Sequence, residues 1–229
     1  MIRIPICAAL LCFAGSIHLH GQLPDYVIQH PVAYTSSVVL DGAISEAEYA
    51  GAIQLELPFE IQPGTNTPAP RKTVGYILRS EEALIVAFEC HYDPAYFRAN
   101  LSRRDEAWGD DFIGIALDVY GDTRNMVYLA SNAYAVQMDI RKNNPATQLD
   151  DEFDGSYDVN FETYAQRFDG YYTVEMRIPF NSLQFGSREE QRWRFAFYRQ
   201  LYEGGQQVGT QSYPVDRTSP CNDCLYNHA

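Results

Sequence analysis

The sequence predicts an all-β protein, a two-sheet antiparallel β-sandwich of the jelly-roll kind with short helical turns. About ten short runs of apolar, β-branched and aromatic residues recur at near-regular spacing. Gly, Pro, Asn and Asp residues separate these runs, as they do in the turns between antiparallel strands. Helix signals are few and short, and no internal repeat is visible. This pattern is typical of a single β-sandwich domain.

The first 21 residues have the pattern of a secretory signal peptide. Arg3 supplies the positive charge, residues 4–14 are apolar, and residues 15–21 are small or polar, so cleavage is expected before Gln22. The apolar run is too short to span a bilayer. We therefore expect export to the periplasm, the outer membrane or the extracellular space, with residues 22–32 as an extended leader.

The chain is strongly acidic. It contains 17 basic and 30 acidic residues, which gives a net charge of −13. Removal of residues 1–21 takes away Arg3 alone among these and brings the net charge to about −14. Nucleic acids and anionic membrane surfaces require a basic patch. The charge therefore excludes nucleic acid as a partner and suits neutral ligands or divalent cations.

We place the whole sandwich at residues 33–204. Its first half begins with short elements. Ser45 is a typical N-cap for a short helix over residues 45–52, because glutamates follow it in the first turn. Residues 73–78 and 84–89 flank the turn R-S-E-E and predict a hairpin. The other elements expected here are strands at 38–40 and 55–59, a loop at 63–70 and a helical turn at 93–100.

The second half is organised around residues 103–139. A charged loop that holds Trp108 leads into an apolar strand at 112–119, and a turn rich in Gly, Asp and Asn follows. Asp169–Gly170 is the strongest two-residue hairpin signal in the chain. The remaining strands are expected at 126–130, 134–139, 157–168, 171–178 and 193–202, with a loop at 143–155. We interpret residues 205–229 as a polar tail, or as the start of a C-terminal barrel in a longer protein.

Three cysteines follow the signal peptide. Cys90 lies in an apolar strand and is expected in the core, as is Trp193 at the start of the last strand. Cys221 and Cys224 form a single CxxC in the tail. Zinc prefers four nitrogen or sulfur ligands, which one CxxC does not supply. We therefore favour a local disulfide between these two cysteines over a metal site.

Six motifs, taken in order, resemble the carbohydrate-binding module family 9-like domain, one of the DOMON-like sandwiches. The most similar subgroup precedes an outer-membrane β-barrel of unknown function. The motifs are L-D-G-A-I-S-E-A-E-Y-A-G-A (40–52), R-R-D (103–105), D-D-F-I-G-I-A-L-D (110–118), N-A-Y-A-V-Q-M-D (132–139), G-Y-Y-T-V-E-M-R-I-P-F-N-S-L (170–183) and W-R-F-A-F-Y-R (193–199). The resemblance covers residues 33–202 of the predicted sandwich.

The resemblance implies a non-catalytic module that binds a glycan, in an exported envelope protein linked to carbohydrate catabolism. In such modules aromatic rings flank the sugar, while Arg, Asn, Gln and acidic side chains bond its hydroxyls. Trp108 and Asn132 match two positions of this pattern. Gly114 departs from it, because sugar-binding members tend to carry a carboxylate there. The alternative is therefore a structural or docking domain of an outer-membrane protein, with a degenerate sugar site and an envelope protein as its partner.

We predict the ligand site at the end of the strand 112–119 that adjoins the charged loop. The Trp108 ring is available to stack on a sugar or to anchor the loop. Arg103, with Arg104 and Asp105 beside it, is available to clamp hydroxyls or to form a local ion-pair network. The predicted ligand-binding residues are Trp108, Arg103, Asp111, Asn132 and Gln137.

Other functions have weaker signals. Asp118 and Asp122 bracket a turn, and their oxygens suit a structural Ca²⁺, although turn chemistry explains them without a metal. A glycosidase would need two carboxylates that face each other across a cleft. A haem-binding DOMON-like domain would need an axial Met or His. A glycoside hydrolase accessory region and a haem protein are therefore minor alternatives, and we expect no catalytic residue.

Overall fold

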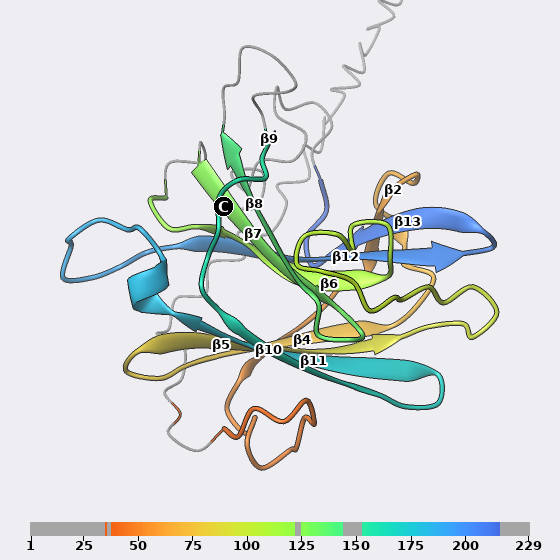
Figure 1. Ribbon diagram of the computed structural model, residues 1–229, viewed down its shortest axis with the longest axis horizontal. Helices are drawn as coiled ribbons and strands as arrows, with labels where there is room; N and C mark the ends of the chain where they lie inside the picture. Colours follow the sequence, from red (N-terminus) through yellow and green to blue (C-terminus); the bar gives the residue numbers. More distant parts are fainter. Residues whose placement is uncertain (1–34, 36–37, 122–124, 144–152, 216–229) are drawn as a thin grey trace, which may run out of the picture.

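The computed structural model describes residue 35 and residues 38–121, 125–143 and 153–215. Two antiparallel sheets pack face to face, which confirms the predicted β-sandwich (Figure 1). The five-stranded sheet has the order β1-β4-β5-β11-β10, and the eight-stranded sheet has the order β3-β2-β13-β12-β6-β7-β8-β9. The strands are β1 (Ile53–Glu56), β2 (Phe59–Gln62), β3 (Thr67–Pro68), β4 (Thr73–Arg79), β5 (Ala83–His91), β6 (Phe112–Asp118), β7 (Asn125–Asn132), β8 (Gln137–Asn143), β9 (Phe153–Asp154), β10 (Glu162–Arg167), β11 (Tyr171–Pro179), β12 (Arg194–Glu203) and β13 (Gln206–Gln211), and a 3₁₀ turn, η2 (Phe180–Ser182), follows β11.

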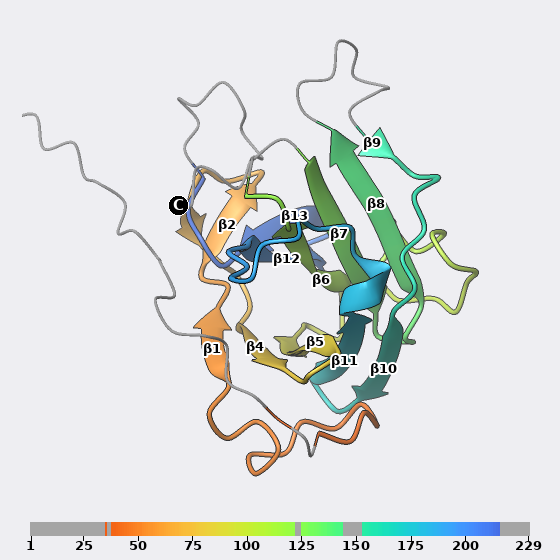
Figure 2. The same cartoon turned by 90° about the vertical axis from the view of Figure 1, so that its left-hand side faces the viewer.

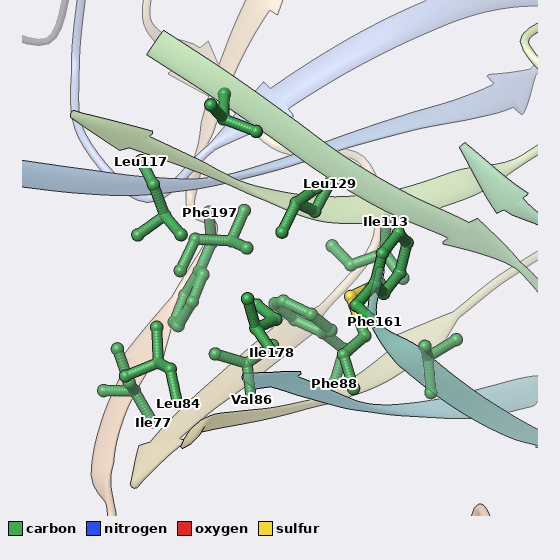
Figure 3. Packing of buried hydrophobic residues seen from close by; sticks show 14 of the residues in the cluster. Ile77, Leu84, Val86, Phe88, Ile113, Leu117, Leu129, Phe161, Ile178 and Phe197 are labelled. Atoms are coloured by element: carbon green, nitrogen blue, oxygen red, sulfur yellow. The ribbon is translucent and has the colours of Figure 1, made fainter. Parts of the chain in front are cut away.

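The main core lies between the sheets and follows from the two-residue period of the strands. On β6, Ile113, Ile115 and Leu117 are buried against the other sheet. The opposite strands β5 and β11 present Val86 and Met176 in the same way. Figure 3 shows Ile113, Leu117 and Phe197 from one sheet and Val86, Phe88 and Ile178 from the other meeting between the two layers. Cys90 belongs to this core, as predicted.

The eight-stranded sheet is strongly curved. Figure 2 shows its outer strands β2 and β8 raised on either side of the central strands β12 and β6, on the side away from the five-stranded sheet. Strand twist and curling produce this shape in large antiparallel sheets. The face of the eight-stranded sheet that does not pack on the core is therefore concave.

Residues 38–52 cover the outer face of the five-stranded sheet. The predictions of a strand at 38–40 and of a helix at 45–52 were wrong, because residues 38–40 have no regular secondary structure and residues 46–51 form turns. Gly51, with a φ of +88°, ends the turn too early for a helix to develop. Tyr49 is buried against this sheet, and the Glu175 carboxylate accepts hydrogen bonds from its hydroxyl (2.6 Å) and from the N–H groups of Asp41 (3.0 Å) and Gly42 (2.7 Å).

Three predicted strands have different bounds because the chain changes sheets or turns within them. Leu57 and Pro58 divide the expected strand 55–59 into β1 of one sheet and β2 of the other. Part of the expected strand 134–139 is a turn, in which Ala135 has a φ of 58°. Residues 157–161 connect β9 of the eight-stranded sheet to β10 of the five-stranded sheet, so only Glu162–Arg167 of the expected strand is paired.

The sandwich also continues beyond residue 204, where we expected it to end. β13 pairs with β12 on one side and with β2 on the other. Beyond it, Val215 exchanges two hydrogen bonds with the Asn66 side chain, both 2.8 Å long. The run Gln206–Gln211 is rich in glutamine and resembles a polar tail, but its alternate residues Val208 and Thr210 are buried.

Several predictions fall outside the described residues. They concern the signal peptide at 1–21, the leader at 22–32, Asp122, and the Cys221–Cys224 pair. Within the part of the chain that the structure covers, no helix is long and apolar enough to cross a membrane.

The buried carboxylate of Glu175 predicts a large effect on stability. In Glu175→Ala, two backbone N–H groups and the Tyr49 hydroxyl lose their acceptor, so the free energy of unfolding should fall by about 2–4 kcal/mol. Glu82→Ala is the matched control, because its side chain is 83% exposed and only pairs with Arg177 at 3.5 Å. That change should cost less than about 0.5 kcal/mol. Urea denaturation measures both, and equal effects would contradict the anchoring role of Glu175.

Candidate functional site

An aromatic row follows the concave face of the eight-stranded sheet. We use this name for Trp108, Phe112, Tyr198 and Tyr128, whose rings meet edge to face. The ring centroids of Trp108 and Phe112 are 5.3 Å apart, those of Phe112 and Tyr198 are 6.0 Å apart, and those of Tyr198 and Tyr128 are 5.3 Å apart. Phe112 is buried, whereas the other three side chains keep part of their surface exposed.

Small residues in β6, β7 and β12 make room for these rings. Ala116, Ala130 and Ala196 are almost fully buried in the apolar clusters that include the row. Gly114 is the extreme case, because a Cβ there would overlap the carbonyl oxygen of Leu129 and would lie 2.9 Å from the Tyr198 hydroxyl. No carboxylate side chain fits at position 114. The departure from the family pattern thus has a steric reason, since the Tyr198 phenol takes up that space.

Asp110 joins the loop that carries Trp108 to the sheet. Its carboxylate accepts hydrogen bonds from the backbone N–H of Asn100 (2.8 Å), from the Asn100 side chain (2.7 Å) and from the Asn132 side chain (2.9 Å). The side-chain oxygen Oδ1 of Asn132 in turn accepts hydrogen bonds from the N–H groups of Tyr134 and Val136 and shapes the β7–β8 turn. Asn132 is fully buried. The structure therefore places it beneath the loop, where it holds two segments together.

Asp111 lies on the other side of the strand and is also fully buried. Its Oδ1 accepts a hydrogen bond from the N–H of Tyr202 (2.9 Å), and its own N–H donates to the carbonyl of Arg98 (2.7 Å). Burial is the main cause that raises the pKa of this carboxyl to about 7, against the opposing effect of Arg199. Asp111 thus anchors both ends of the loop 98–111.

Gln200 and Tyr202 of β12 complete the support of Trp108. The Gln200 side chain donates to the carbonyl of Trp108 (2.8 Å), and the Tyr202 hydroxyl donates to that of Gly109 (3.1 Å). The guanidinium of Arg98 lies 4.0 Å from the centre of the Tyr202 ring. The sequence analysis missed these residues and Tyr198. The sequence feature that could have identified them is the two-residue alternation in R-F-A-F-Y-R-Q-L-Y, where Phe195 and Phe197 face the core and the tyrosines face away.

Arg104, and not Arg103, forms the ion-pair network. Its guanidinium donates to Gln137 Oε1 (2.7 Å), to Asp139 and to the carbonyl of Val159 (2.7 Å). The Gln137 amide nitrogen donates to the carbonyl of Phe161. Both polar ends of Gln137 are thus committed at the edge where the chain crosses between the sheets. The Arg103 side chain is exposed, in the same loop as Trp108.

Two groups of carboxylates have the composition of a cation site. Asp105, Asp139 and Asp158 bring oxygens within 4.8 Å of one another, but the Arg104 guanidinium lies 3.6 Å or less from each of the three and supplies the positive charge. Asp118 is buried, and its Oδ1 accepts from the N–H groups of Tyr120 (3.2 Å) and Gly121 (2.7 Å), which is turn chemistry. Asp122, its proposed partner, is outside the described residues.

Trp193, the second tryptophan, lies at the opposite end of β12 from this site. It packs against the main core and contacts Phe180 and Phe185, with ring centroids 5.9 Å and 5.2 Å away. Its side chain is only partly buried.

Of the five predicted ligand residues, the structure gathers Trp108, Asp111 and Asn132 around one loop, leaves Arg103 on the surface of that loop, and places Gln137 at the sheet edge.

The chain has the β-sandwich fold of carbohydrate-binding modules. More narrowly, it has the fold of family 9. A protein from Bacteroides uniformis ATCC 8492 described as a candidate carbohydrate-binding protein superposes with a TM-score of 0.62 at 13% identity, covering 85% of this chain and 94% of its own. A family 9 module from Caldicellulosiruptor kristjanssonii superposes in complex with cellotriose (TM-score 0.54, 16% identity, 84% and 87% covered) and in complex with glucose (TM-score 0.52, 16% identity, 86% and 90% covered). No protein-family model and no curated protein matches the sequence.

The raised pKa of Asp111 predicts that the protein loses stability as the pH rises. The unfolded carboxyl titrates near its ordinary value of about 4, whereas the folded one titrates at about 7, so the folded state binds the proton more tightly. The contribution is fully present below about pH 4 and is lost as the pH rises through 7. Between these limits it amounts to about 2–4 kcal/mol.

The variant Asp111→Asn isolates this contribution, because it keeps the shape and the acceptor of the side chain but does not ionise. The pKa values of Asp139 and Glu175 are also raised by burial, so the wild type has other sources of pH dependence. Urea denaturation of both proteins from pH 4 to pH 8 should show a shallower fall in the variant. Parallel curves would contradict the assignment.

Proposed function

We propose that this chain is a non-catalytic carbohydrate-binding module that holds a glycan on the concave face of the eight-stranded sheet. The aromatic row is the observation that carries this proposal. Flat rings bind the apolar face of a sugar through their surface and their quadrupole, without any need for charge. Trp108, Tyr198 and Tyr128 offer partly exposed rings along one surface, and the strands below them are rigid. The glycan complexes of the similar family 9 module support this choice of ligand.

The predicted ligand residues divide into two roles in this proposal. Trp108 and Arg103 contact the glycan, because both retain exposed surface in the loop 98–111. Asp111 and Asn132 are positioning residues, because both are buried and hold that loop through the hydrogen bonds described above. Gln137 would act on the loop only indirectly, through its hydrogen bond with Arg104. The missing carboxylate at Gly114 leaves the rings as the main source of affinity.

We further propose that the module belongs to an exported envelope protein that takes part in carbohydrate catabolism. The signal-peptide pattern at residues 1–21 supports export, and the acidic composition suits a neutral ligand. Among the described residues, the cluster of Asp105, Asp139 and Asp158 is paired with Arg104 in a structural ion-pair network, which supports a non-catalytic role.

A docking domain for an outer-membrane or envelope protein is the second candidate. Of the five residues predicted to touch a sugar, Asn132 and Gln137 have both polar ends of their side chains engaged within the protein, and Asp111 is fully buried. Position 114 also has no room for the usual acceptor. A sandwich that retained its rings but lost its hydroxyl contacts would present the concave face to a protein partner instead.

A glycan titration decides between these two functions. Isothermal titration of the wild type against a panel of oligosaccharides, cellotriose and glucose among them, should identify a ligand. Trp108→Ala should then weaken binding by about tenfold to a hundredfold, because one stacking ring contributes about 1–3 kcal/mol. The free energy of unfolding should change by only about 1 kcal/mol, because the side chain is in a loop and partly exposed.

Tyr164→Ala is the matched control, since this ring is 41% exposed on β10 of the other sheet. It should leave the affinity unchanged. Equal losses in both variants, or full affinity in Trp108→Ala, would place the ligand elsewhere. A folded wild type that binds no member of the panel would favour the docking domain.

A further inference from the structure

A polar cluster interrupts the apolar core at the end of the sandwich next to the loop 98–111. Both sheets contribute to it through residues that face inward, and none of these is more than 2% exposed. We call it the inter-sheet polar cluster, and it consists of Thr73, Cys90 and Tyr172 from the five-stranded sheet and Asp111, Arg199 and Thr210 from the eight-stranded sheet.

The strand registers place these residues side by side. Arg199 of β12 is paired with Thr210 of β13, while on the facing sheet Cys90 of β5 is paired with both Thr73 and Tyr172. The Arg199 guanidinium connects the two layers. It donates to the Thr73 hydroxyl (2.7 Å) and lies 5.6 Å from the centre of the Tyr172 ring.

Most of the hydrogen-bonding capacity of this cluster is not used by protein groups. Five of its buried polar atoms have no hydrogen-bond partner among the described residues, namely Arg199 Nε, Arg199 Nη2, Asp111 Oδ2, the Tyr172 hydroxyl and Thr210 Oγ1. Besides burial, the Cys90 thiol acts on the Tyr172 hydroxyl and helps to raise its pKa, but a thiol is a weak hydrogen-bond partner. Buried polar atoms in native proteins are nearly always hydrogen-bonded, and a buried guanidinium has a particularly strong requirement.

We propose that the inter-sheet polar cluster is a binding site for ordered water molecules, which bridge the guanidinium of Arg199 to the carboxylate of Asp111. The two side chains form no direct ion pair, yet Arg199 is the main charge that acts on Asp111. Their charges have opposite signs, so the site favours a neutral ligand over an anion. The ligand must also donate to Asp111 Oδ2 and accept from the Arg199 N–H groups. Water does both, and a buried water typically forms about three hydrogen bonds.

This site would act on the loop 98–111 through Asp111. One carboxylate oxygen of Asp111 is held by the N–H of Tyr202, and its own N–H is bonded to Arg98. Water on the second oxygen would fix the remaining freedom of the side chain at the point where the loop joins β6. The inference does not depend on the proposed glycan, because it concerns the interior of the protein alone.

A high-resolution crystal structure of the wild-type protein, grown in sodium bromide, tests the proposal. We expect ordered water within hydrogen-bond distance of Arg199 Nη2 and Asp111 Oδ2, with no anomalous peak. The region around Ile115 and Val86 in the same crystal is an internal control and should hold no water, because it is lined by apolar side chains. A bromide peak beside Arg199 would overturn the proposal in favour of an anion site. A direct contact between Arg199 and Asp111 without water would overturn it as well.

A solution measurement on the same protein removes any effect of the lattice. Nuclear Overhauser transfer from long-lived water to the protein should reach protons of Thr210 and Tyr172 and should not reach the methyl groups of Ile115. Transfer to neither group would contradict a bound water. Asp111→Asn should weaken the signal, because its amide oxygen is held by the N–H of Tyr202 and the amide nitrogen that replaces Oδ2 cannot accept a hydrogen bond. An unchanged signal in that variant would show that the carboxylate is not bridged as proposed.

Discussion

Two adjacent buried carboxylates at the start of β6 determine how the rest of the site is arranged. Successive side chains of a strand point to opposite faces. Asp110 is therefore bonded to Asn100 and Asn132 beneath the loop, whereas Asp111 faces the space between the sheets and is bonded to the backbone of Tyr202. Buried carboxylates are costly unless such bonds compensate them. The loop that presents Trp108 is consequently fixed from both faces of one strand.

This arrangement separates the residues that support the site from those that present it. The support consists of buried polar groups with defined partners, such as Asn132 and Asp110. The surface consists of rings that lie on alanines and on Gly114, where backbone and phenol leave no space for a side chain. An aromatic surface on a rigid sheet requires little rearrangement when a flat ligand binds, and the ordering cost of binding is correspondingly low. For the glycan proposed above, this arrangement would favour a preformed surface over an induced one.

The sequence predicts the fold class well, because the strands β4, β5, β6, β11 and β12 combine apolar content with clear turn signals on either side. It predicts the bounds poorly wherever tertiary contacts override local pattern. Residues 45–52 begin with a good N-cap but pack as turns over Glu175. The strand β13 reads as a polar tail because it is rich in glutamine, although Val208 and Thr210 within it are buried. Near the proposed site, the sequence correctly places Trp108 in a loop that leads into the strand β6. The roles of Asp111 and Asn132 could not be predicted, because a polar residue beside a loop looks the same in sequence whether it faces solvent or is buried beneath it.

The central claim is that the concave face of the eight-stranded sheet, and not the outer face of the other sheet, is the binding surface. A titration of isotopically labelled protein with an oligosaccharide, followed by amide and indole chemical shifts, tests it most directly. The account predicts that the largest changes occur at the Trp108 indole and at the amides of residues 98–111, Tyr128 and Tyr198. Changes confined to β10, β11 and residues 38–52, or no changes with any glycan, would contradict it.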